Sequence, residues 1–253
     1  MMDYGLNLYS LRNFIKTEAD FLDTARKLKE MGYTNLQYSG APFDADMIKR
    51  VSDSVGIPIV LTHVPFARVL EDTEALMEEH SRFNCKNIGI GSIGPDIIVD
   101  EKLCKERVEK LNLAAEKMNK NGFSFFYHNH HFEFYKYGTQ TLYDYMIENA
   151  PYINFTFDTY WIQRGGASVT EYVEKLKGRI ECVHLKDFKI IKKDEYVASE
   201  CAVGEGVMNF KSIIPKMIES GTKYFIVEQD NAVEFPEPLA EVKKSIDYLK
   251  GEF

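Results

Sequence analysis

The sequence predicts a (β/α)8 barrel that takes up the whole chain, residues 1–253, as a single domain. Eight short apolar runs, suited to buried β-strands, alternate with longer amphipathic segments of helical spacing. Several helical segments stop at a glycine just before the next apolar run, as expected of a repeated strand–helix unit. Strands that are separated by helices pair in parallel through right-handed crossovers.

The predicted strands, in chain order, are Tyr4–Tyr9, Asn35–Tyr38, Pro58–His63, Asn87–Gly91, Phe123–His128, Ile153–Asp158, Ile180–Leu185 and Tyr224–Glu228. An open doubly wound sheet is the alternative for this pattern, and it usually carries a glycine-rich phosphate loop after its first strand. Leu6–Leu11 contains no glycine. The closed barrel is therefore favoured.

The predicted helices lie between these runs. Apolar residues recur at helical spacing along Glu18–Met31, and Gly32 is a natural end for that helix. Further helical patterns occur within Glu109–Gly122 and Ile213–Ser220, and a last helix is expected at Glu237–Leu249.

The connection after the seventh strand is unusually long. Asp187–Asn209 carries a charged run, KIIKKDEYVASE, followed by VGEGVMNF. Ordinary strand-to-helix connections are much shorter, and long ones are often functional. We expect a functional loop or a small hairpin over the mouth of the barrel.

Composition and charge narrow the classes of partner. The chain has 45% hydrophobic and 28% charged residues, which is ordinary for a globular protein, and its net charge of −8 argues against a nucleic-acid partner. No signal peptide is visible, and no apolar run reaches the ~18 residues that span a bilayer. We expect a cytoplasmic protein without a membrane partner. Its cysteines form no metal or disulfide pattern and are expected to be reduced: Cys85, Cys104, Cys182 and Cys201.

Polar residues end three consecutive predicted strands. Asp158, His184 and Glu228 follow apolar runs, and in a barrel the carboxyl ends of the strands surround one mouth. Each residue alone has an ordinary alternative, such as a helix cap for Asp158 or a packed core position for His184. Together they offer mixed oxygen and nitrogen ligands, which suit Mn²⁺, Zn²⁺, Co²⁺, Fe²⁺ or Mg²⁺. The sequence therefore predicts a divalent metal site.

The fifth strand ends in an unusual segment, YHNHHFEF. Alternation along an extended chain puts His128 and His130 on one face and His131 on the other. We expect His128 or Glu133 to be a fourth metal ligand, and another histidine to transfer protons. A solvated polar loop is the alternative.

Further candidates are expected around the same mouth. His63 ends the third strand, the only tryptophan, Trp161, follows the sixth, and Lys186 follows the seventh. Aromatic faces beside polar groups often bind sugars, although core packing explains single aromatic residues equally well. Arg164 and Glu205 are candidate substrate contacts. The alternative for Arg164 is a solvated surface charge, and the alternative for Glu205 is a plain Gly-Glu-Gly turn. Other residues expected near the mouth are Tyr9, Arg12, Phe66, Tyr160 and Asp187.

The most specific segments are YHNHHFEF, FDTYWIQRGG, CVHLKDF, VGEGVMNF and FIVEQD. Together they resemble the xylose isomerase-like barrel superfamily, in particular its sugar phosphate isomerase/epimerase group, along essentially the whole chain. The resemblance implies a metal held by Glu, Asp, His and Glu from four strands. Asp158, His184 and Glu228 match the last three. The place of the first Glu falls near Tyr127 and His128, so either His128 substitutes or Glu133 reaches back.

The resemblance implies chemistry on a small carbohydrate or keto-sugar. We expect an isomerase or epimerase that works through an enediolate, with His128, Glu228 and Lys186 as catalytic groups. Substrate contacts are expected from His63, His130, Trp161, Arg164 and Glu205.

Three alternatives stay open. Related epimerases use two metal-bound glutamates and only one is assured here, so a dehydratase resembling the inosose dehydratases is the first alternative. A sugar-binding barrel without catalysis is the second. A metal-dependent nuclease is disfavoured by the charge of −8 and by Trp161, which stands where a ligand histidine is expected. Pairing of two copies is left open.

Overall fold

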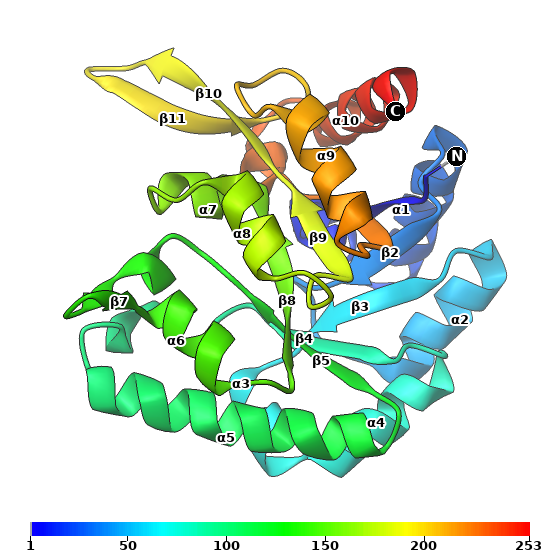
Figure 1. Ribbon diagram of the computed structural model, residues 1–253. Helices are drawn as coiled ribbons and strands as arrows, with labels where there is room; N and C mark the ends of the chain where they lie inside the picture. Colours follow the sequence, from blue (N-terminus) through cyan, green and yellow to red (C-terminus); the bar gives the residue numbers. More distant parts are fainter. Residues whose placement is uncertain (1) are drawn as a thin grey trace.

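The first and last strands of the barrel pair in parallel, with Leu6 opposite Val227, and close the sheet on itself. The computed structural model describes residues 2–253, and the barrel in it has eight strands in the order β1-β12-β9-β8-β5-β4-β3-β2 (Figure 1). The strands are β1 (Tyr4–Asn7), β2 (Asn35–Tyr38), β3 (Ile59–His63), β4 (Asn87–Ile90), β5 (Ser124–His128), β8 (Ile153–Asp158), β9 (Cys182–Leu185) and β12 (Tyr224–Val227). The (β/α)8 barrel predicted from the sequence is confirmed.

Every predicted strand is present, with differences at the ends. The first strand stops at Asn7 instead of Tyr9, because a 3-10 helix, η1 (Leu8–Phe14), begins there and the Asn7 side chain accepts a hydrogen bond from the Tyr9 N–H. The last strand stops at Val227, one residue before Glu228.

Helices surround the barrel (Figure 1). They are α1 (Glu18–Met31), α2 (Ala45–Val55), α3 (Phe66–Glu71), α4 (Thr73–Arg82), α5 (Glu101–Lys120), α6 (Leu142–Asn149), α7 (Thr159–Arg164), α8 (Val169–Lys175), α9 (Phe210–Glu219) and α10 (Pro238–Glu252), with shorter 3-10 turns η2 (Pro95–Ile97), η3 (Phe132–Phe134) and η4 (Asp230–Glu234). Gly32 ends α1 as predicted, with a φ of 98° that favours glycine.

Two helices begin earlier than their patterns suggested. The pattern within Glu109–Gly122 is only the second half of α5, which Asp100 caps at its start by accepting a hydrogen bond from the Leu103 N–H. The pattern that begins at Ile213 belongs to α9, which starts at Phe210 after the capping residue Asn209. Caps therefore set these boundaries, rather than hydrophobic periodicity.

The long connection after β9 forms a hairpin, which is one of the two forms expected for it; the other was a loop. The hairpin extends away from the barrel (Figure 1). Its antiparallel strands are β10 (Asp187–Lys192) and β11 (Tyr196–Cys201). The buried carboxylate of Asp187 accepts hydrogen bonds from the N–H groups of Phe188, Gly204, Gly206 and Met208, at 2.8–3.1 Å. Asp187 thus fastens both ends of the hairpin to one point. A second small hairpin consists of β6 (Lys136–Tyr137) and β7 (Gln140–Thr141).

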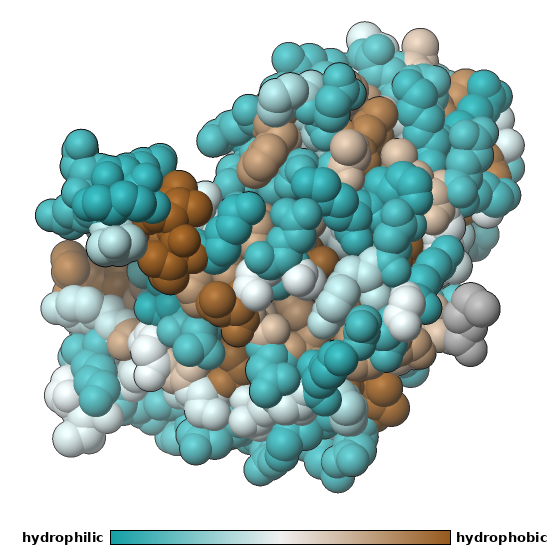
Figure 2. Space-filling view, turned by 90° about the horizontal axis from the view of Figure 1, so that it is seen from above, coloured by the Kyte–Doolittle hydropathy of each residue, from teal (hydrophilic) through white to brown (hydrophobic). Residues whose placement is uncertain are grey.

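Three further features of the fold concern the surface, the cysteines and the lengths of the helices. The face seen from above is mostly hydrophilic, with a few hydrophobic patches (Figure 2). All four cysteines are buried and unpaired, as predicted. Among residues 2–253, helices are too short or too polar to cross a bilayer.

Candidate metal centre

Alternation along the strands explains why the site residues converge. A small apolar cluster that is separate from the main core includes Phe126, Cys182 and Ile226, from β5, β9 and β12. His128, His184 and Glu228 each follow one of these residues by two positions, so each side chain points to the same face as its apolar neighbour. The apolar cluster thus underlies the polar site.

Four buried side chains meet there. His128, Asp158, His184 and Glu228 each offer one ligand atom, and these atoms lie within 4.8 Å of one another. Nε2 of His128 is 3.4 Å from Oδ2 of Asp158 and 3.8 Å from Oε2 of Glu228. Nδ1 of His184 is 3.7 Å from the Asp158 oxygen and 2.8 Å from the Glu228 oxygen. Two imidazoles and two carboxylates form a donor set suited to a divalent transition metal.

The orientation of His184 also fits a metal ligand. Its Nε2 lies 2.6 Å from Oε1 of Gln37, an oxygen that can only accept, so Nε2 carries the proton in the neutral ring. Nδ1 then presents a lone pair to the cluster. Although Nδ1 is only 2.8 Å from Glu228, it is buried and has no partner of hydrogen-bonding geometry. A second contact that fixes the tautomer is typical of histidine ligands.

The charges of the cluster favour a cation. Burial opposes ionisation of both carboxyl groups, but Lys186 and the imidazoles lower the pKa of Asp158 to about 2, and His184 and Lys186 hold the pKa of Glu228 well below its usual value. Burial alone would lower the pKa of His184, but the carboxylates of Glu228 and Asp158 raise it to about 9. These residues therefore fit a divalent metal.

Neighbouring polar groups orient the two carboxylates. Asn7 donates from Nδ2 to Oε1 of Glu228, which leaves Oε2 facing the cluster. The other oxygen of Asp158, Oδ1, accepts a hydrogen bond from the Trp161 N–H at 2.9 Å and so caps α7. Both expectations for Asp158, a cap and a member of the cluster, hold at once. Oδ1 of Asn129 accepts a hydrogen bond from the Asp158 N–H at 3.0 Å.

Lys186 lies beside the cluster and is fully buried. Its Nζ is 2.6 Å from Oδ2 of Asp230, 3.4 Å from Oε2 of Glu228 and 3.8 Å from Oε1 of Glu200. These carboxylates outweigh the cost of burial and raise the pKa of Lys186 well above its usual value. Lys186 is therefore a charged partner of Glu228.

Glu133, the alternative fourth ligand, is not part of the cluster. Its oxygens accept hydrogen bonds from the Tyr127 hydroxyl at 2.7 Å and from the His130 N–H at 2.8 Å. The short helix η3 turns the chain after His131, so Glu133 faces Tyr127 instead of the mouth. Burial raises the pKa of Glu133 to about 7. His128 is the strand-five residue that the structure brings to the cluster.

A cavity of about 320 Å³ opens above the cluster. His63 and His130 lie on its wall beside His128, with the ring centres of His63 and His130 at 5.4 and 4.7 Å from that of His128. Burial lowers the pKa of His63 well below its usual value and that of His130 to about 2, so both imidazoles are neutral. The lining residues are Asn7, Tyr9, Ser39, Gly40, His63, Gly91, Ser92, His128, His130, Glu228 and Asp230.

Trp161 and Arg164 lie beside this wall, outside the lining of the cavity. The Trp161 ring is 5.3 Å from that of His130, and Nζ of Lys186 lies 4.9 Å from its centre. The exposed Arg164 stacks on Trp161 at 5.4 Å and donates to the Tyr160 hydroxyl. Among the described residues, Arg164 therefore contacts the aromatic cluster rather than the cavity.

The structure does not bring Glu205 to the mouth. Its carboxylate is 3.2 Å from Lys244 of α10 and 3.9 Å from Lys189 of β10, and it is exposed. The Gly-Glu-Gly turn instead supplies two of the N–H groups that Asp187 binds. Glu205 thus projects from a turn into solvent, in line with the plain turn that was the alternative for this residue.

Sequence reasoning missed several polar residues of the site, four of which contact the cluster or Lys186. Asn7 and Gln37 contact Glu228 and His184, while Glu200 and Asp230 surround Lys186. Asn7 and Gln37 could have been found from the sequence, since each is a polar residue within an apolar run. No sequence pattern indicated Glu200, because only the docking of the hairpin brings it to the mouth.

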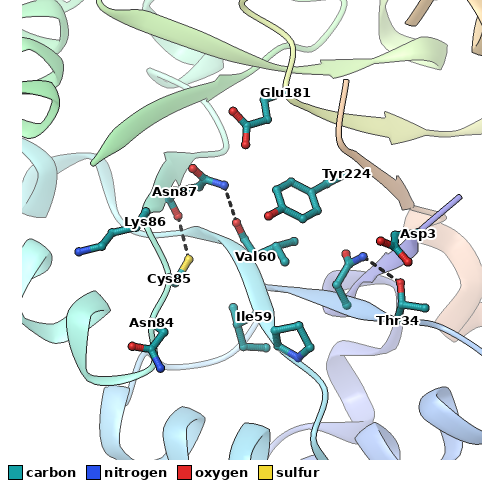
Figure 3. A pocket seen from close by; sticks show the side chains of 12 residues that line it. Asp3, Thr34, Ile59, Val60, Asn84, Cys85, Lys86, Asn87, Glu181 and Tyr224 are labelled. Carbon is teal, nitrogen blue, oxygen red and sulfur yellow. Dashed lines mark hydrogen bonds between the residues drawn. The ribbon is translucent and has the colours of Figure 1, made fainter. Parts of the chain in front are cut away.

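A second cavity lies at the opposite end of the barrel (Figure 3). It measures about 370 Å³ and lies among the first residues of β2, β3, β4 and β12 and the loops before them. Figure 3 shows Asn87 bonded to the Val60 carbonyl oxygen on one wall and Tyr224 on another. Residues at this end of a barrel usually serve stability. None of the site residues predicted from the sequence lies among its lining residues.

Comparison with known proteins identifies the family. Residues 25–252 match the family model described as xylose isomerase-like TIM barrel. The chain belongs to this family. As a xylose isomerase-like barrel, it has the fold and the family expected from its motifs. No curated protein gave a significant match.

Solved structures of xylose isomerase-like barrels carry several different names. A sugar phosphate isomerase/epimerase from Parabacteroides distasonis has a TM-score of 0.80 and 22% identity, over 99% of this chain and 94% of that one. A probable 3-DHS dehydratase involved in petrobactin synthesis, from Bacillus anthracis, has a TM-score of 0.74 and 16% identity, over 100% of both chains. A family 2 AP endonuclease from Brucella melitensis has a TM-score of 0.70 and 17% identity, over 100% of this chain and 99% of that one. At these identities the likeness shows the fold alone.

Proposed function

We propose that this protein is a metal-dependent isomerase or epimerase that acts on a small carbohydrate or keto-sugar. The observation that carries the proposal is the buried cluster of His128, Asp158, His184 and Glu228 at the floor of a cavity at the barrel mouth. A bound divalent metal would polarise a carbonyl group and its neighbouring hydroxyl. Family membership and the isomerase/epimerase neighbour support this class of reaction.

The protein's own groups would handle the proton. Oε2 of Glu228 is held ionised beside Lys186 and faces Nε2 of His128 at 3.8 Å. We assign removal and return of the proton next to the carbonyl to the carboxylate of Glu228, because a bound metal would occupy the lone pair of His128 Nε2. The buried Nδ1 of the neutral His130 has no partner and can accept a hydrogen bond from a substrate hydroxyl.

The lining of the cavity supports a polyhydroxylated substrate. Side chains of Asn7, Ser39 and Ser92 offer both donors and acceptors, and Asp230 offers carboxylate oxygens. Such groups bind hydroxyls in either direction. The Tyr9 ring adds an apolar face to the same wall. A volume of about 320 Å³ lies at the lower end of the range for small-molecule sites.

The test uses hydrogen exchange. The chelated protein is incubated with a panel of keto-sugars in D2O with and without Mn²⁺, and deuterium at the carbon beside the carbonyl is followed by NMR. We expect exchange only with the metal, and none in Asp158→Asn, which keeps an oxygen for the α7 cap but removes a ligand charge. Asp194→Asn, in the exposed hairpin tip, is the matched control. Full turnover in the chelated protein or in Asp158→Asn contradicts the proposal.

A dehydratase is the second candidate. The cluster contains only one glutamate, Glu228, and pairs it with imidazoles instead of a second glutamate. Two groups with different pKa values suit an elimination, in which one removes a proton and the other protonates the departing hydroxyl. The same NMR experiment separates the two reactions, since a dehydratase product has lost water and an epimer has not.

Two other readings have direct tests. Tight sugar binding in calorimetry, without any product, supports a non-catalytic sugar-binding barrel. A strand-incision assay on abasic DNA tests the nuclease activity named for one of the neighbours, and we expect no cleavage because the chain carries a net charge of −8.

A further inference from the structure

One side chain of the hairpin β10–β11, Glu200, reaches Lys186 beside the candidate metal-binding cluster. Glu200 lies near the end of β11, and its side chain is only 12% exposed. Its Oε2 accepts a hydrogen bond from the Asp230 N–H at 2.6 Å, and its carbonyl oxygen accepts one from Nδ2 of Asn231 at 3.0 Å. Glu200 thereby joins the hairpin to the start of η4, directly after Glu228 and Gln229.

Glu200 also completes the surroundings of Lys186. Its Oε1 lies 3.8 Å from Nζ of Lys186, beside Oδ2 of Asp230 at 2.6 Å and Oε2 of Glu228 at 3.4 Å. A fully buried ammonium group without such partners is very costly. Glu200 therefore acts on Lys186 directly, through its carboxyl oxygen, and indirectly, by fixing the backbone of Asp230.

We propose that Glu200 is a positioning residue, which the hairpin supplies to hold Lys186 against Glu228. The hairpin is then a component of the site rather than a surface decoration. Asp187 makes this docking rigid, because it binds backbone N–H groups on both sides of the hairpin. The consequence for turnover rests on the proposed function, whereas the effect on Lys186 is measurable without any substrate.

The readout for Lys186 is the only tryptophan of the chain. Nζ of Lys186 lies 4.9 Å from the centre of the Trp161 ring, close enough for a cation to interact with it. Lys186→Met shows how Trp161 emission changes when the charge is removed. We expect Glu200→Gln to change the emission in the same direction, because the ammonium group loses a charged partner while an oxygen for the Asp230 N–H is kept. Glu195→Gln makes the same change at the exposed hairpin tip and serves as the control.

Kinetics provide the second readout. Because Glu200 is outside the cavity lining, we expect Glu200→Gln to lower kcat about tenfold or more with little change in KM, as removal of a supporting contact does. Glu200→Asp, which keeps the charge, should recover part of kcat and of the wild-type emission.

The outcomes separate the two proposals. If no keto-sugar is turned over, the proposed function fails, but the emission of Glu200→Gln still decides the role of Glu200. If the emission of folded Glu200→Gln matches that of Glu195→Gln and of the wild type, the positioning role is wrong. If Glu200→Gln does not fold, the same comparison is made with Glu200→Ala, for which an unchanged emission and kcat overturn the proposal.

Discussion

Oε1 of Gln37 on β2 lies 2.6 Å from Nε2 of His184 on β9, across the interior of the barrel. This contact leaves Nδ1 of His184 as the atom that faces Asp158 and Glu228. A residue of the second strand thus sets the tautomer of a candidate ligand on a strand that is not its neighbour in the sheet.

Gln37→Leu is expected to weaken metal binding. Loss of a contact that orients a histidine ligand typically costs about 10- to 100-fold in metal affinity. Titration calorimetry of the chelated protein with Mn²⁺ measures the change, and Gln163→Leu, at an exposed position of α7, is the control. Equal affinity of Gln37→Leu and the wild type would show that the tautomer of His184 does not matter.

Metal binding is expected to depend on pH. Because the carboxylates around His184 raise its pKa to about 9, the metal-free ring is protonated at neutral pH and must lose a proton to bind a metal. Affinity should therefore rise about tenfold per pH unit between pH 6 and 8, and level off as pH passes about 9. Calorimetry at pH 7 in buffers of different ionisation enthalpy should detect about one released proton. A release of zero protons contradicts the arrangement described.

Three of the four cluster residues were predictable from the sequence. Asp158, His184 and Glu228 end consecutive strands, and parallel strands of a barrel present their carboxyl ends to one mouth. The choice between His128 and Glu133 was not predictable, because it depends on the short helix η3, which turns Glu133 back onto Tyr127. Glu200 was beyond sequence reasoning, since its contact with Lys186 depends on how the hairpin docks.

Glu133 is expected to make stability fall with rising pH. Burial raises its pKa from 4.5 to about 7, so between these values the folded protein holds a proton that the unfolded chain has lost. The free energy of unfolding therefore decreases from about pH 4.5 to about pH 7, and the whole loss is present above pH 7. One pKa unit corresponds to about 1.4 kcal/mol, so the loss amounts to a few kcal/mol.

Glu133→Gln removes this titration. Urea unfolding at pH 5 and pH 8 should show a smaller difference between the two pH values in Glu133→Gln than in the wild type. Glu195→Gln, at an exposed position, should leave the difference unchanged. The same difference in Glu133→Gln and the wild type would mean that Glu133 is not the group responsible.

Asp187→Ala is expected to destabilise the protein by about 1–3 kcal/mol, because it removes the acceptor of four half-buried or exposed N–H groups, which water can only partly replace. The change leaves without an acceptor the N–H groups that Asp187 holds together at the base of the hairpin. Urea unfolding measures the loss, with Asp194→Ala at the hairpin tip as the control. A loss no larger than that of Asp194→Ala would show that Asp187 does not fasten the hairpin.

The closure of the barrel has a consequence for biosynthesis. Asn7 of the first strand donates to Glu228, which directly follows the last strand, and that contact exists only when β1 and β12 pair. A nascent chain on the ribosome that stops before β12 already contains His128, Asp158 and His184, but its barrel is open between β1 and β9. A metal could therefore bind at the complete cluster only after translation has delivered the final strand.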